Sequence, residues 1–97
     1  MYRIIDGRGT GKTSRLMLLA KETNGTIICS NPHAMLQKAH AYGITGIDFI
    51  SYNDFLLSGK GLDIGNYYID EMESFLEVLQ ASVGIRGVLC GYSLSED

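Results

Sequence analysis

The feature that most limits the fold of this chain is a glycine-rich segment near its start. A short β-like run at residues 2–6 leads into Asp-Gly-Arg-Gly-Thr-Gly-Lys-Thr, and a helical pattern follows from about residue 12 to residue 23. Closely spaced glycines let backbone N–H groups converge on an anion, and the start of a helix attracts negative charge. A strand, this loop and a helix, in that order, predict a phosphate-binding loop.

This loop fits the Walker A pattern G-x-x-x-x-G-K-[ST] with one departure. Asp6 stands where the pattern has its first glycine, and Gly7 falls one residue late. An aspartate that bonds nearby backbone amides can start the turn in place of glycine. The residues expected to hold the phosphates are Gly7, Arg8, Gly9, Thr10, Gly11, Lys12 and Thr13. The alternative is a glycine-rich turn that binds no ligand.

Two side chains of the loop have expected roles in binding ATP or, less favoured, GTP. Lys12 is expected to reach the β- and γ-phosphates, and the Thr13 hydroxyl to bind Mg²⁺. A carboxylate must complete the Mg²⁺ site, and Asp70 at the end of a predicted strand supplies it. Glu71 follows directly and is predicted to be the general base that orients the attacking water. The alternative is a helix start that simply attracts acidic residues.

The rest of the chain alternates between short strands and helices, which predicts one α/β domain over residues 1–97. Five strands are expected, at residues 2–6, 26–30, 47–51, 66–70 and 87–91. Helices are expected from Pro32 to Tyr42, behind an Asn31 cap, and after Glu71, with a short helical turn at residues 53–57. Residues 58–65 contain three glycines and are predicted to be a moving loop. The apolar residues of the helix after Glu71 are predicted to be core: Met72, Phe75, Leu76, Leu79 and Val83.

These motifs together resemble the additional-strand catalytic-glutamate division of P-loop ATPases, which includes helicases, RecA-like proteins, phage terminase motors and thymidine kinases. The resemblance implies a three-layer α/β/α P-loop NTPase fold with a mainly parallel sheet of about five strands. It implies the strand order 1-4-3-2. In that order the last strand lies between the Walker A strand and the Walker B strand, which ends at Asp70. The loop is similar to the G-G-R-G-S-G-K-S form of terminases, which implies that Arg8 contacts the γ-phosphate.

The function expected from this resemblance is binding of ATP and Mg²⁺ with slow hydrolysis, in a protein that assists DNA or RNA transactions of a phage or another mobile element. Glu71, Lys12 and Arg8 are the expected catalytic residues. Arg86 is the candidate arginine finger, a cation offered to the nucleotide of a neighbouring subunit in a homo-oligomer. The alternative is an ordinary surface charge. One alternative is a non-catalytic module whose nucleotide orders a surface for a protein partner. Another is a thymidine-kinase-like phosphotransferase, although the lasso and zinc lobe of those kinases have no counterpart here.

Charge and composition bear on the partners and the location. Residues 1–40 carry six basic and two acidic side chains, a charge of +4, whereas residues 41–97 carry two basic and nine acidic ones, a charge of −7. The basic half could draw a polyanion, or could be ordinary solvated helix faces. Cys29 and Cys90 are predicted to be reduced core thiols. No apolar run approaches the roughly 18 residues of a membrane span, so we expect a cytoplasmic protein without a membrane partner.

Overall fold

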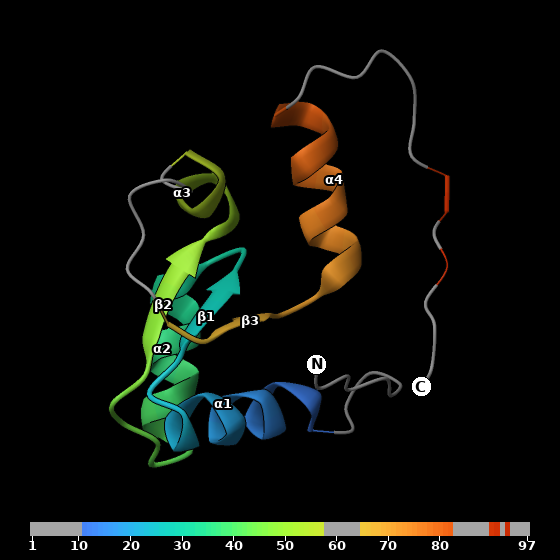
Figure 1. Ribbon diagram of the computed structural model, residues 1–97. Coiled ribbons are helices and arrows are strands. Elements are labelled where there is room, and N and C mark those ends of the chain that lie inside the picture. Colours follow the sequence, from blue (N-terminus) through green and yellow to red (C-terminus); the bar gives the residue numbers. More distant parts are fainter. Residues whose placement is uncertain (1–10, 58–64, 83–89, 92, 94–97) are drawn as a thin grey trace.

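The fold is α/β, with helices packed around a small parallel sheet (Figure 1). The computed structural model describes residues 11–57, 65–82, 90, 91 and 93. The described elements are α1 (Lys12–Glu22), β1 (Thr26–Cys29), α2 (Pro32–Ala41), β2 (Asp48–Ser51), α3 (Tyr52–Leu57), β3 (Tyr67–Ile69) and α4 (Met72–Ser82).

The described sheet has three strands in the order β2-β1-β3, and both pairs are parallel. Thr26 at the start of β1 pairs with Asp48 on one side and with Tyr67 on the other. Because parallel strands share one direction, the residues that follow all three strands lie at the same edge of the sheet. At that edge Ser51 leads into α3, and Asp70 and Glu71 lead into α4.

The face of the sheet toward α1 and α2 carries the main hydrophobic core. Successive residues of a strand point to opposite faces, and Ile27 and Cys29 of β1 both point to this one. The buried members of this core cluster are Met17, Ala20, Ile27, Cys29, Met35, Ala39, Ile44 and Ile47. The partly buried Leu16, Phe49 and Tyr68 pack against it.

On the opposite face, an aromatic side chain of α3 contacts β3, and an aromatic side chain of α4 packs against α3. Phe55 of α3 lies 5.9 Å from the ring of Tyr67 in β3, measured between centroids. Phe75 of α4 approaches the rings of Phe55 and Tyr52, with centroids 6.2 Å and 5.5 Å apart. α3 therefore contacts the opposite face of the described sheet through Phe55, and α4 is held against α3.

The turn from α1 into β1 shows how residues 24 and 25 end the helix before the strand begins. Asn24 takes a left-handed conformation with φ of 53° and donates its N–H to the carbonyl of Lys21. The N–H of Gly25 reaches back to the carbonyl of Ala20 at 2.7 Å. This pair of bonds satisfies the last carbonyls of the helix. It confirms the prediction that Asn24 and Gly25 end the first helix.

The start of α2 also follows the sequence prediction. The side chain of Asn31 accepts a hydrogen bond from the N–H of Ala34 at 3.1 Å, and Pro32 occupies the first turn. At the other end Gly43 has φ of 72°, and the N–H of Ile44 bonds the carbonyl of Ala39. Ile44 thereby enters the core cluster beside Ala39, which fixes the path of the chain toward β2.

Two predictions about buried residues are wrong. The apolar residues of the last predicted helix were expected in the core, but no residue of α4 is fully buried and Met72 is 39% exposed. Apolar spacing identifies the inner face of a helix but does not say how completely that face is covered: Phe75, Leu76 and Leu79 are only partly buried. Cys29 is buried as expected, but Cys90 is exposed.

Several predictions fall outside the described residues. The first strand, at residues 2–6, and most of the glycine-containing segment at 58–65 belong to them, as do Val83 and Arg86. Of the last predicted strand, residues 87–89 are likewise outside, while Cys90 and Gly91 are described and are not in a strand. Within the described ranges, no helix has the length and apolar character needed to cross a membrane.

Candidate functional site

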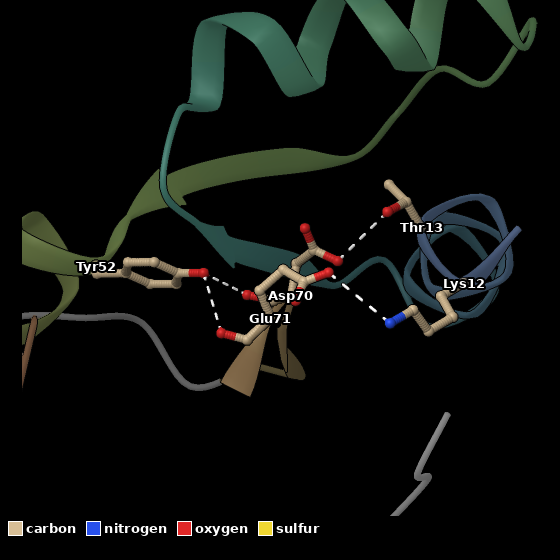
Figure 2. Close-up of polar contacts among 5 residues, drawn as sticks. All are labelled: Lys12, Thr13, Tyr52, Asp70 and Glu71. Atoms are coloured by element: carbon tan, nitrogen blue, oxygen red, sulfur yellow. Dashed lines mark hydrogen bonds and ion pairs between the residues drawn. The ribbon is translucent and has the colours of Figure 1, made fainter. Parts of the chain in front are cut away.

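Two segments that are far apart in the sequence meet at the carboxyl edge of the sheet (Figure 2). The Thr13 hydroxyl in the first turn of α1 donates to Oδ1 of Asp70 at 3.5 Å, across 57 positions of sequence. Beside it, the Lys12 ammonium lies 3.9 Å from Oε1 of Glu71. The start of a helix, one hydroxyl, one cation and two carboxylates therefore converge in one place.

The start of α1 is set by Gly11. This residue has φ of 80°, a backbone conformation that residues with a side chain rarely adopt. Its carbonyl accepts a hydrogen bond from the N–H of Arg15 at 3.1 Å. Ser14 also donates its hydroxyl to that carbonyl at 2.9 Å. Met17 and Ala20 anchor the helix in the core cluster. The anchored turns thus present Lys12 and Thr13 toward the end of β3.

The junction between β3 and α4 carries the two carboxylates. The N–H of Asp70 donates to the carbonyl of Ile28 at 2.9 Å, which continues the pairing of β3 with β1. Glu71 then takes φ of 59°, and its carbonyl accepts the N–H of Phe75 at 3.1 Å as α4 begins. The chain therefore changes from strand to helix within the two residues that carry the carboxylates.

Tyr52 crosses the sheet edge to this junction from the start of α3. The residue is 3% exposed, and its single hydroxyl proton is shared between the main-chain carbonyl of Asp70 and, at 3.3 Å, that of Glu71 (Figure 2). Burial, with the charge of Asp70 next in importance, raises the pKa of Tyr52 to about 12. The hydroxyl therefore keeps its proton at neutral pH and remains a donor.

The electrostatic setting of Asp70 favours a bound cation. Partial burial, followed by the negative charge of Glu71, raises the pKa of Asp70 above its ordinary value. The charges of Lys38 and Lys12 and the hydrogen bond from Thr13 act in the opposite direction. A carboxylate that is desolvated and lies beside another carboxylate gains from a cation brought close to both.

Cys29 lies at the end of β1, and its thiol donates to the carbonyl of Ile50 at 3.7 Å. Burial, and then the charge of Asp70, raises the pKa of Cys29 to about 11. The thiol is therefore protonated at neutral pH. Because the thiolate is the nucleophile and the metal ligand, Cys29 is a packing residue here.

Thr13 and Asp70 bring two oxygen donors close together at this edge of the sheet. Among the described residues no group of three or more His, Cys, Asp and Glu side chains could hold a metal ion. Mg²⁺ binds oxygen ligands, keeps several waters and takes one or two carboxylates together with substrate phosphates. The hydroxyl of Thr13 and the carboxylate of Asp70 are ligands of that kind.

The predicted site residues divide into two groups. Gly7, Arg8, Gly9 and Thr10 lie outside the described residues. The others are described, and the structure brings Lys12 and Thr13, which follow Gly11, together with Asp70 and Glu71. Sequence reasoning missed Tyr52. The available signal was its position directly after a predicted strand, at the edge where parallel strands end.

The chain was also compared with known proteins. No protein-family model, no curated protein and no solved structure gives a significant match.

Proposed function

We propose that the chain binds ATP with Mg²⁺ at the start of α1 and hydrolyses it slowly. The observation that carries the proposal is the meeting of Lys12 and Thr13 with Asp70 and Glu71, through contacts of 3.5 and 3.9 Å. Sequence motifs alone require no such meeting, since Thr13 and Asp70 are 57 positions apart. The four residues combine the groups that phosphoryl transfer to water uses.

The roles follow from the chemistry of each group. The α1 N-terminus and the Lys12 ammonium attract phosphate oxygens, and Thr13 and Asp70 are the proposed Mg²⁺ ligands. Bound Mg²⁺ would neutralise charge on the phosphates. Glu71 is proposed to accept a proton from the attacking water, and its side chain, 57% exposed, is accessible to solvent.

The contact between Lys12 and Glu71 is one that a phosphate group could replace. Both side chains are accessible to solvent, so the pair contributes little to stability. Lys12 is thus available to exchange Glu71 for a phosphate group, which frees the carboxylate to bind water. Activity in DNA or RNA transactions of a phage or another mobile element is part of the proposal and rests on the resemblance of the motifs.

Isothermal titration with ATP, GTP and ADP, each with and without Mg²⁺, tests the proposal directly. We expect Mg²⁺ to strengthen ATP binding, and Lys12→Ala to weaken it by about 10- to 100-fold, because a hydrogen bond to a charged group is worth about 1.5–3 kcal/mol. Lys21→Ala is the matched control, since it removes the same charge from an exposed position in the last turn of α1.

The control should bind ATP like the wild type. Equal ATP binding by Lys12→Ala and Lys21→Ala would remove the phosphate site from the start of α1. If the wild type binds ATP but turnover assays detect no phosphate release, the chain is a nucleotide-dependent interaction module rather than an ATPase. Phosphate transfer to an added nucleoside would instead indicate a kinase.

A further inference from the structure

The backbone that carries the two carboxylates takes an unusual conformation. Glu71 has φ of 59°, in the left-handed region that residues with a side chain rarely occupy. Such a conformation costs free energy and persists where surrounding contacts hold it. The N–H of Asp70 bonds β1, and the carbonyl of Glu71 accepts the first hydrogen bond of α4. These contacts hold the two ends of the junction.

Tyr52 holds the middle of the junction. Its hydroxyl donates to the carbonyls of both Asp70 and Glu71, on either side of the turn. The ring is fixed in turn by its edge-on contact with Phe75, whose centroid lies 5.5 Å away. Tyr52 directly follows β2, on the far side of β1 from β3, so its hydroxyl ties this junction to another strand of the sheet.

We infer that Tyr52 is a positioning residue for hydrolysis: it fixes the Asp70–Glu71 peptide so that the Glu71 carboxylate is held beside the start of α1. The inference rests on the proposed ATPase function and adds a residue to it. Tyr52 touches main-chain atoms of the two acidic residues rather than substrate. Its loss should therefore change the rate of the chemical step more than the affinity for ATP.

Tyr52→Phe tests this inference with little change in packing, because it keeps the ring and removes the hydroxyl. We expect kcat for ATP to fall about 10- to 100-fold, since a small misplacement of a catalytic group has an effect of this order. The dissociation constant for ATP with Mg²⁺ should stay within about twofold of the wild type, because Lys12 and Thr13 are untouched and the N–H of Asp70 still bonds Ile28 in β1.

Tyr68→Phe is the matched control. Its hydroxyl bonds Thr23 at 2.8 Å on the other face of the sheet, so this variant also loses a tyrosine hydrogen bond. Thermal melts of both variants show that the assays are made on folded protein. Tyr68→Phe should keep the wild-type kcat. An equal fall of kcat in both variants would mean that Tyr52 matters through stability alone and would overturn the inference.

A double-mutant cycle identifies the group through which Tyr52 acts. In a Glu71→Gln background, adding Tyr52→Phe should leave the residual rate unchanged, because the positioned carboxylate is already gone. A further fall of similar size would place the effect elsewhere and contradict the inference. If the wild type itself releases no phosphate, the proposed ATPase fails and the inference fails with it. An active wild type with an equally active Tyr52→Phe overturns the inference alone.

Discussion

The two faces of the sheet are built differently. The face toward α1 and α2 packs a buried cluster of mostly aliphatic residues, including Met17, Ile27 and Met35. The face toward α3 and α4 is aromatic and more open: Tyr52 and Ile28 are buried, but α4 has no fully buried residue. Close packing of apolar side chains dominates stability on the first face. On the second, a buried hydroxyl holds the main chain at the candidate site.

This difference separates the residues that make the fold from those that arrange the site. The core side of β1 can be altered without touching a carboxylate, and the carboxylates can be altered without opening a cavity. We therefore expect substitutions on the two faces to have distinct phenotypes. Variants of the aliphatic core should change the free energy of unfolding, and variants of the junction should change the rate or the metal dependence.

The largest expected effect is on the junction side. Glu71→Gln removes the proposed base, and we expect kcat for ATP to fall by about 10²-fold or more while ATP binding is retained. The free energy of unfolding should change by less than about 0.5 kcal/mol, because the side chain is exposed. Glu77→Gln, an exposed position of α4, is the control for loss of charge. Equal turnover by the two variants would remove Glu71 from the mechanism.

The next effect is a loss of stability, caused by a cavity on the face of the sheet toward α1 and α2. Ile27 is completely buried, so Ile27→Ala should lower the free energy of unfolding by about 2–5 kcal/mol, as measured by urea denaturation. Ile50→Ala makes the same change at a partly buried position of β2, on the opposite face, and should cost only about 1–2 kcal/mol. Where Ile27→Ala remains folded, its ATP affinity should match the wild type. Equal losses at both positions would break the contrast between the two faces.

A smaller effect is expected where α1 turns into β1. A methyl group added at Gly25 would lie 2.8 Å from the Tyr68 ring and 2.9 Å from the carbonyl oxygen of Asn66. Gly25→Ala should therefore cost about 1–3 kcal/mol of stability by overpacking. At Gly43 an added Cβ meets nothing within 4 Å, although φ is 72°. Gly43→Asn should cost less than about 1 kcal/mol, since Asn tolerates this conformation. If Gly25→Ala lost less stability than Gly43→Asn, the structure around residue 25 would have relaxed to fit the added methyl group.

The last effect concerns Asp70, and it is a gain in stability rather than a loss. Because the pKa of Asp70 is raised in the folded protein, the folded state binds a proton more tightly than the unfolded state. Its ionisation therefore lowers stability as the pH rises from the unfolded pKa through the folded one. Asp70→Asn should therefore stabilise the protein at neutral pH.

The stability gain of Asp70→Asn should disappear at acid pH, where the wild-type carboxyl is protonated. Thermal melts of wild type and variant across this pH range measure the difference. The same variant should weaken ATP binding in the presence of Mg²⁺ and leave Mg²⁺-free binding nearly unchanged. Loss of stability at neutral pH, or unaltered Mg²⁺ dependence, would contradict the assigned environment or the proposed metal role.

Local signals explain how much of the fold could be predicted. Asn31 with Pro32 marks a helix start, and Asn24 with Gly25 a helix end, through bonds that span five residues or fewer. These features need no knowledge of the rest of the molecule. The partial exposure of α4 could not be predicted in this way, because burial depends on which distant segments pack against a helix.

The candidate site was predictable where its residue types carry the chemistry. Lys12 with Thr13, and Asp70 with Glu71, could be paired through motif chemistry before any contact was known. Tyr52 belongs to no motif, and its one signal was its position directly after a predicted strand. Its contact with Asp70 and Glu71 depends on the order β2-β1-β3, which brings the residue after β2 close to the junction that follows β3. A tyrosine after a strand gives no indication of that order.

The separation of 57 positions between Thr13 and Asp70 has a consequence for folding kinetics. Parallel pairing requires a crossover for each new strand. The entropy cost of closing each loop must be met before the contacts that stabilise the pairing can form. During synthesis α1 and β1 emerge well before β3, so the basic start of α1 exists for some time without its acidic counterpart. The contact between Thr13 and Asp70 closes only when β3 has docked. Its formation would therefore report completion of the sheet rather than the growth of any one helix.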